Sequence, residues 1–323
     1  MRVTYGPRRP SRAIHAGFTA PDNMAREDAM PPIVDAHAHI AREMTGFRRP
    51  TRHGRAIDEG REAQFFPPSF DPVASPPETL LAYMDQAGVD RTFLVQHHLY
   101  GDQNALVLAT LKQWPDRFSG FAYLGPMTDP GDPDRLARLL GEGMIGLKIE
   151  LPSTRRLNAA FRWDGAGEMR LWECLARLGR PLWIDINGCN GEDVTALDRA
   201  LTSVGGVRLM VCHVGGAPQG IWRERALLAK KFDGWTDLAA VPLLSGPEAE
   251  YPYPEAQEIV RWAVEQFGAD RVLWGSDYPP TLNSSTYRQL IDFVRRHCPF
   301  LTPAQKDQIL GGAAEAVRRA FTS

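Results

Sequence analysis

The stretch VDAHAHI, residues 34–40, places two histidines, His37 and His39, directly after an apolar lead-in. Successive side chains of a β-strand point to opposite faces, so residues two apart share a face. If this stretch is a strand, both imidazoles and the carboxylate of Asp35 therefore face one side. Two neutral imidazoles that converge on one point suit a divalent cation. The alternative is a polar strand end with ordinary hydrogen-bonded histidines.

The length and charge of the chain limit its class. It has 323 residues, 43% of them hydrophobic, and a formal net charge of −2. This length fits one large α/β barrel or two medium domains. The balanced charge gives no reason to expect nucleic acid or an anionic membrane as a partner, and no apolar run approaches the ~20 residues of a membrane span. The four cysteines are scattered without a C-x-x-C pair, which predicts reduced thiols in a cytoplasmic protein.

Residues 1–32 differ from the rest of the chain. They are rich in arginine and lack the apolar segment of a signal peptide, so we predict no export. We expect an N-terminal extension that lies over the domain surface or reaches a partner subunit, which leaves a homodimer open. No domain boundary is evident after it, so residues 33–323 are predicted to form a single domain.

From residue 33 a short apolar run, a loop and an amphipathic helical pattern alternate. Eight such units match a closed (β/α)8 TIM barrel better than an open sheet, and no glycine-rich phosphate loop is present. A polar, proline-rich insertion at 41–75 is expected to cover the catalytic face. The predicted strands are 33–37, 92–96, 120–124, 145–150, 182–186, 207–213, 234–239 and 271–277, and the predicted helices are 77–88, 103–115, 133–141, 167–179, 192–203, 219–231, 254–268, 284–297 and 303–321.

Ionisable residues close several of these apolar runs. In a barrel the carboxyl ends of the strands converge on one mouth, where such residues are typical of an active site. No serine or cysteine occupies a G-x-S-x-G elbow, so nothing indicates a covalent nucleophile. The strand-end residues are His37, His39, Glu150, Asp185, His213 and Asp277.

The motifs D-A-H-A-H, H-V-G-G and W-G-S-D-Y-P resemble those of the amidohydrolase superfamily. More narrowly they resemble the amidohydrolase 2 branch, which contains aminocarboxymuconate-semialdehyde decarboxylase and the pyrone-dicarboxylate and muconolactone lactonases. The resemblance spans residues 33–320. The stretch FLVQHHLYGDQNALVLATL, residues 93–111, is similar to the lactonase-type members.

The resemblance implies roles for individual residues. His37 and His39 would bind one divalent ion, zinc or alternatively manganese, and Asp277 would be a metal ligand, a general base, or both. His213 would polarise the substrate or activate water. The chain departs from the family where metal-dependent members carry a histidine on the fifth strand, because Asp185 stands there. Asp185 or Glu150 would then complete the ligand set, and a metal-free lactonase mechanism stays open.

Substrate contacts are expected from residues that follow the strands. Arg155 and Arg156 could grip a carboxylate in fork geometry, or they could be solvated loop residues. Lys148 could pair with Glu150 or contact a substrate carboxylate, and a carboxylated lysine that bridges two metals is a weaker alternative. The predicted substrate-binding residues are His97, His98, Tyr100, Lys148, Arg155, Asn187 and Tyr278.

These observations predict a metal-dependent hydrolase that attacks the carbonyl of a small carboxylated lactone with activated water. One alternative is a non-oxidative decarboxylase of an aromatic or muconate-type acid. An alternative of another class is a catalytically silent barrel that acts as a binding protein.

Overall fold

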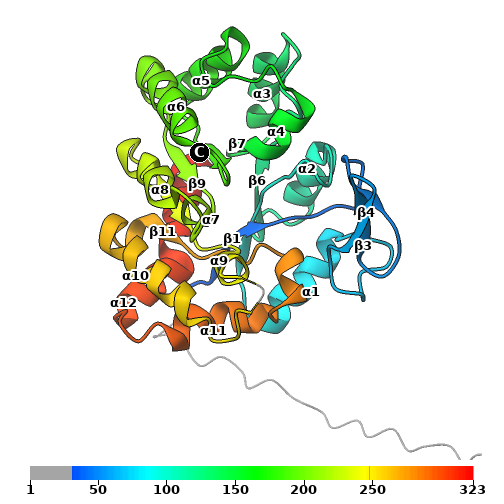
Figure 1. The fold of residues 1–323 in the computed structure, drawn as a ribbon, viewed down its shortest axis with the longest axis vertical. Coiled ribbons are helices and arrows are strands. Elements are labelled where there is room, and N and C mark those ends of the chain that lie inside the picture. The colour runs from blue at the N-terminus through cyan, green and yellow to red at the C-terminus, as the bar shows by residue number, and fades with distance from the viewer. Residues whose placement is uncertain (1–30, 247, 323) are drawn as a thin grey trace, which may run out of the picture. The chain divides into compact units, whose positions relative to one another are not determined.

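Eight parallel strands form one sheet that closes on itself (Figure 1). The computed structural model describes residues 31–246 and 248–322. Backbone hydrogen bonds from Ala36 N to Trp274 O (2.9 Å) and from Asp277 N to His37 O (2.8 Å) join the first strand to the last. The predicted (β/α)8 barrel is therefore confirmed. Its strands, in spatial order, are β1 Val34–Ala38, β5 Arg91–Leu94, β6 Phe118–Ala122, β7 Gly146–Glu150, β8 Leu182–Asp185, β9 Leu209–Val211, β10 Trp235–Asp237 and β11 Val272–Leu273.

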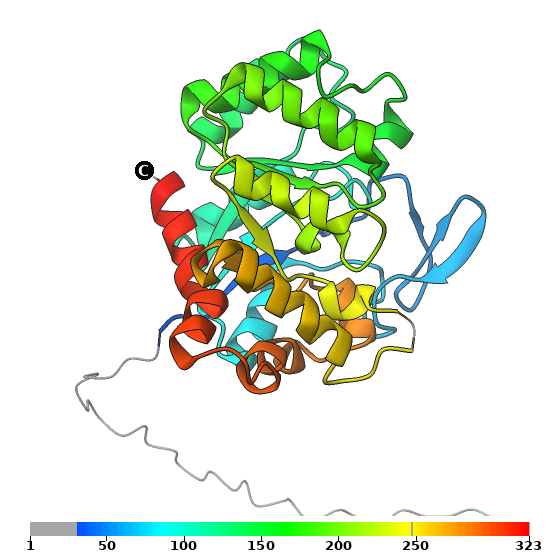
Figure 2. The same ribbon diagram turned by 60° about the vertical axis from the view of Figure 1, so that its left-hand side comes forward.

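Helices follow the strands and surround the sheet (Figure 2). Across the described part of the chain, no helix combines the length and apolar character needed to cross a membrane. The main helices are α1 Pro77–Ala87, α2 Asn104–Gln113, α3 Asp132–Gly141, α5 Ala166–Leu178, α6 Gly191–Val204, α8 Trp222–Lys231, α10 Pro254–Phe267, α11 Tyr287–His297, α12 Pro303–Asp307 and α13 Ala313–Phe321. Short helical turns lie at α4 Leu151–Leu157, α7 His213–Gly216, α9 Val241–Leu244, Ala269–Arg271 and Pro280–Asn283.

Local sequence signals explain where several helices begin. Asn190, Thr286 and Thr302 each accept the backbone N–H three residues ahead, and each forms a capping box. The helix predicted over 303–321 is instead interrupted by a π-helical turn, Gln308–Gly312. The turn packs against the entry to β1, where an ideal Cβ on Gly311 would lie 1.7 Å from the Pro32 carbonyl oxygen.

The barrel interior is a packed core. Its cluster combines side chains from the strands with the last helix, and it includes Phe93, Phe121 and Trp183. Phe321 of α13 packs edge-on against Trp235, the first residue of β10. Because Trp235 begins its strand, α13 covers the amino-terminal end of the barrel and leaves the carboxyl-terminal end for the site.

The insertion after β1 is more ordered than the predicted loop. It contains a three-stranded antiparallel sheet of β2 Arg49–Pro50, β3 Arg55–Asp58 and β4 Arg61–Gln64, which projects from the barrel (Figures 1 and 2). Glu59 and Gly60 connect β3 to β4 with φ angles of 49° and 79°. Two consecutive positive φ angles are typical of the type I′ turn that joins hairpin strands. The sequence signal of this hairpin is weak, because few residues alternate around the turn and the segment is polar and rich in proline.

The compact unit that contains the barrel runs from Pro31 to Ser323. The predicted N-terminal extension, residues 1–32, falls almost entirely outside the described residues. Its role and the homodimer therefore stay predictions.

Candidate active site

The two histidines of β1 lie at the carboxyl end of that strand with their rings in contact. Both are buried, and their ring centroids are 5.1 Å apart. Asp35 does not join them, which corrects the prediction from strict alternation. Its carboxylate instead accepts a hydrogen bond from the Tyr287 hydroxyl on α11 (2.6 Å). The register of β1 against β5 shifts between Asp35 and Ala38, and such a bulge re-aims the side chains that follow it.

Asp277 faces both histidines across the seam of the barrel. Its Oδ1 lies 3.0 Å from His39 Nε2 and 3.6 Å from His37 Nε2. The predicted last strand reaches residue 277, but β11 ends at Leu273, and Asp277 has a left-handed φ of 54°. Such a conformation is rare outside glycine and recurs at functional sites. Burial would raise the pKa of Asp277, but the neighbouring histidines, His39 first, hold it well below its usual value.

His213 reaches the same mouth from the opposite side. Its ring centroid lies 4.9 Å from that of His37, and its Nδ1 donates to the Ala239 carbonyl oxygen at 2.6 Å. The predicted strand extends to residue 213, whereas β9 ends at Val211 because His213 has a left-handed φ of 56°. Burial would lower the pKa of His213, but nearby carboxylates, Asp237 first, raise it.

Asp237, at the end of β10, is a site residue that the sequence analysis did not select. It is fully buried and accepts from His37 Nδ1 (3.2 Å), from Trp183 Nε1 (3.2 Å) and from the His213 backbone N–H (3.0 Å). It therefore orients two of the three histidines. A signal was available, because Asp237 stands near the end of the apolar run 234–239 in the way that Asp185 and Asp277 end theirs.

The donor set of His37, His39 and Asp277 fits a divalent cation. One nitrogen or oxygen atom from each lies within 4.8 Å of the others. His37 Nδ1 is engaged by Asp237, and His39 Nδ1 by the Val95 carbonyl oxygen at 2.9 Å. Both Nε2 atoms are thus left with a lone pair, and burial lowers the pKa of both imidazoles. Two such lone pairs that face an ionised carboxylate oxygen repel one another unless a cation lies between them.

Glu150 is held apart from this set. Its Oε2 lies 2.9 Å from His97 Nε2, and neither residue belongs to a three-donor group. Burial alone would raise the pKa of Glu150, but His97 and the nearby Lys148 lower it to about 2. Lys148 is 2% exposed. Burial would lower its pKa, but the neighbouring Cys212 and several carboxylates raise it, so the ammonium is retained inside the barrel.

Asp185 and Asn187 lie at the edge of the site, whereas the predicted contact Arg155 is engaged away from it. Asp185 Oδ2 is 3.7 Å from His213 Nε2, close to this histidine but outside the donor set of His37 and Asp277. Asn187 donates its backbone N–H to Asp185 Oδ1 at 2.9 Å. Arg155 is directed elsewhere, because its guanidinium forms a two-point ion pair with Asp193 of α6.

Three further predicted contacts follow β5 and β11. Tyr100 is buried and its ring lies 5.2 Å from that of His39, so it lines the site as part of the wall. His98 is 2% exposed, and hydroxyl groups hydrogen-bond both of its ring nitrogens. Tyr278 is fully buried and packs against Phe70. The substrate contacts expected of His98 and Tyr278 therefore stay predictions.

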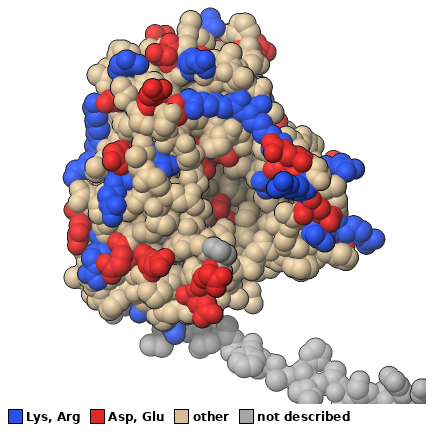
Figure 3. All heavy atoms as spheres, in the orientation of Figure 1, with Lys and Arg blue, Asp and Glu red and all other residues tan. Residues whose placement is uncertain are grey.

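The surface over the strand ends is hollowed. Figure 3 shows this hollow between the barrel and the inserted sheet, with acidic atoms at its base and charged side chains on its rim. Asp58 of β3 binds two arginines, Arg48 at 2.9 Å and Arg156 of α4 at 2.7 Å. Arg156 also lies over the Phe47 ring, 4.0 Å from its centroid. The insertion is thus anchored beside the mouth of the barrel.

Comparison with known proteins agrees with this architecture. The family model described as Amidohydrolase matches residues 34–319. A relative from Comamonas testosteroni, named 2-pyrone-4,6-dicarboxylate hydrolase, is 24% identical over 290 residues, which cover 84% of this chain and 86% of the relative.

Solved structures share the fold. A probable 2-pyrone-4,6-dicarboxylic acid hydrolase from Acinetobacter baumannii with citric acid bound has a TM-score of 0.65 at 18% identity, and the match covers 88% of this chain and 98% of that one. An amidohydrolase from Burkholderia multivorans with bound zinc has a TM-score of 0.66 at 17% identity, covering 90% and 99% of the two chains. The family match spans nearly the whole barrel and includes every strand that carries a site residue, so the chain belongs to the amidohydrolase family.

Proposed function

We propose that the protein is a metal-dependent hydrolase that opens a small carboxylated lactone. The observation that carries this proposal is the convergence of His37, His39, Asp277 and His213 at the carboxyl ends of three barrel strands. The relative named 2-pyrone-4,6-dicarboxylate hydrolase supports a cyclic ester with carboxylate groups as the substrate class.

The ion would be held by His37, His39 and Asp277, and when bound it supplies Lewis-acid polarisation of a carbonyl oxygen and a lower pKa for a coordinated water. Zinc is our first choice because imidazole nitrogens dominate the set, and manganese is the second. The zinc-bound Burkholderia multivorans structure is consistent with a metal in this fold. Asp185 and Glu150 are left as nearby carboxylates rather than required ligands.

The residues of the chain then perform the proton chemistry. Asp277 is ionised and takes the proton of the attacking water. The Ala239 carbonyl holds His213 Nδ1, so its Nε2 is directed into the mouth. Its raised pKa favours the protonated ring, which would donate from Nε2 to the developing oxyanion.

Positive charge beside this centre suits the substrate carboxylate. Lys148 supplies a buried ammonium, and His97 supplies a partly exposed imidazole whose orientation Glu150 fixes. Asn187 and Tyr100 border the same space. The four described cysteines are all free and buried, which supports a reducing compartment such as the cytoplasm.

The test is to incubate the purified full chain with 2-pyrone-4,6-dicarboxylate and with simple carboxylated lactones, and to analyse the products. Ring opening consumes one water, releases one additional acid group and leaves the carbon count unchanged. Release of CO2 would instead establish the decarboxylase alternative. Binding of these compounds without turnover, in protein whose metal content is one ion per chain by elemental analysis, would favour the silent barrel.

A further inference from the structure

The thiol of Cys212 belongs to the barrel interior and lies close to His37 and His213. Met210 of β9 and Cys212, which directly follows this strand in extended conformation, both belong to the interior cluster. Cys212 is 1% exposed, so it has no contact with solvent. The mechanism proposed above does not use this sulfur.

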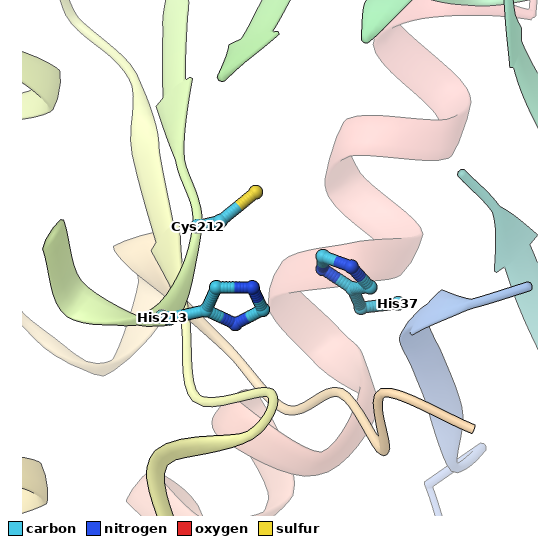
Figure 4. Close-up of side chains that lie close together, drawn as sticks. All are labelled: His37, Cys212 and His213. Carbon is cyan, nitrogen blue, oxygen red and sulfur yellow. The ribbon is translucent and has the colours of Figure 1, made fainter. Parts of the chain in front are cut away.

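The backbone brings His213 to the same side as Cys212. Adjacent residues of a strand face opposite ways, but the left-handed φ of 56° at His213 turns its ring inward. Figure 4 shows Cys212 and His213 projecting from the end of β9 on the side that faces His37. One ligand atom from each of these three residues lies within 4.8 Å of the others.

The hydrogen-bond partners of the His37 and His213 rings engage Nδ1 and leave Nε2 available. Asp237 engages His37 Nδ1, and the Ala239 carbonyl engages His213 Nδ1. Such outer partners fix the tautomer of a ligating histidine and raise its basicity. Both Nε2 atoms are therefore the ones that can bind an ion together with the Cys212 sulfur, and binding displaces any proton on His213 Nε2.

We propose that His37, Cys212 and His213 form a second, sulfur-containing metal site that binds thiophilic divalent ions such as Cd²⁺. The outer set of His37, His39 and Asp277 offers nitrogen and oxygen, whereas the inner set offers nitrogen and sulfur. Soft thiolate ligands select soft ions, and carboxylates suit hard ions such as Mn²⁺. Because both sets need His37 Nε2, one ion excludes the other, and the chemical softness of the ion decides which set it occupies.

Binding at the inner set is accompanied by loss of the thiol proton. The S–H bond breaks, the proton passes to solvent, and the sulfur electron pair forms the bond to the ion. This proposal does not depend on lactone hydrolysis, since it concerns which atoms bind an ion and not which ester is opened.

The test is a Cd²⁺ titration of the metal-stripped full chain, followed by near-ultraviolet absorption. We expect a sulfur-to-cadmium charge-transfer band that saturates at one ion per chain and disappears in Cys212→Ser. Cys189→Ser is the matched control, since Cys189 is another buried free thiol, and this variant should keep the band. Absence of the band in the wild-type protein, or its persistence in Cys212→Ser, would overturn the proposal.

Two further measurements separate the inner set from the outer one. Asp277→Asn should keep the cadmium band while it loses turnover, and loss of the band in this variant would show a single ligand set instead of two. X-ray absorption of the Cd²⁺-loaded wild-type protein needs no variant and should detect one sulfur in the first shell. A shell of nitrogen and oxygen alone would refute the site even if Cys212→Ser does not fold.

Discussion

The charge of Asp277 is required whether it binds an ion or accepts a proton, because both roles use the same oxygen lone pairs. We therefore expect Asp277→Asn to reduce turnover by at least ~10²-fold, the low end for loss of a general acid or base. The amide keeps the shape of the side chain, so the melting temperature of the metal-free protein should change little. A steady-state assay beside a thermal melt measures both.

The matched control for this change is Asp270→Asn, the same substitution at an exposed position just before β11. It should leave turnover and melting unchanged. Near-normal turnover in Asp277→Asn would assign this carboxylate to the turn before the prolines and remove it from the chemistry.

Asp237 gives a second prediction at the residue scale, because it orients metal ligands without being one of the proposed ligands. In Asp237→Asn the His37 ring loses its anionic partner at Nδ1. Loss of such an outer partner typically weakens metal binding by ~10–100-fold. Competition with a chromogenic chelator measures the dissociation constant for Zn²⁺. Unchanged affinity would show that Asp237 serves the packing around Trp183 alone.

Single residues also mark where sequence reasoning stops. His37, His39, His213 and Asp277 could be placed at one mouth because strand ends of a barrel converge. The bulge that separates Asp35 from the histidines could not be predicted from the sequence, because a register shift depends on how β1 meets β5 in three dimensions. The burial of Tyr278 likewise depends on aromatic neighbours from distant segments, including Phe70.

At the scale of elements, the π-helical turn before α13 must accommodate the entry to β1. We expect Gly311→Ala to lower the free energy of unfolding by ~1–3 kcal/mol, the usual cost of overpacking, because the added methyl group would meet the Pro32 backbone. Denaturant unfolding measures the change.

The neighbouring glycine provides the control. A Cβ on Gly312 would approach only the Gln308 side-chain amide, at 2.5 Å, and that flexible group can move aside. Gly312→Ala should therefore be neutral or slightly stabilising, since alanine favours helix over glycine. Equal effects of the two substitutions would mean that the contact with Pro32 does not constrain the turn.

Helices and strands differ in how well the sequence predicted them. The eight strands and most helices were predicted near their observed positions, because apolar runs and amphipathic periodicity report burial directly. The inserted sheet was missed, since its β4 is exposed along its whole length and carries no apolar pattern. The break in the last predicted helix was missed because its cause, the approach of Pro32, lies far away in sequence.

For the whole molecule, a bound ion should stabilise the fold by mass action. An ion at ~100 times its dissociation constant adds ~2.7 kcal/mol if it binds only the folded state. We therefore expect the chelator-treated protein to melt several degrees lower and to recover when Zn²⁺ is restored.

Two histidine variants test whether this stabilisation arises at the site. His39→Asn should abolish the shift in melting temperature, while His53→Asn should keep it, because the His53 side chain is 65% exposed on the insertion. A melting temperature that does not respond to chelation or to Zn²⁺ would point to the metal-free mechanism.

The contact between the first and last strands also determines when the site can form during protein synthesis. His39 and Asp277 touch across 238 positions of sequence, so a ribosome working at ~5–20 residues per second makes the histidines roughly 10–50 s before the carboxylate. During that interval the nascent chain holds two imidazoles without their anionic partner. The complete outer ligand set can therefore form only after the final strand has been synthesised and has docked. The nascent chain reaches its full affinity for the ion only late in synthesis.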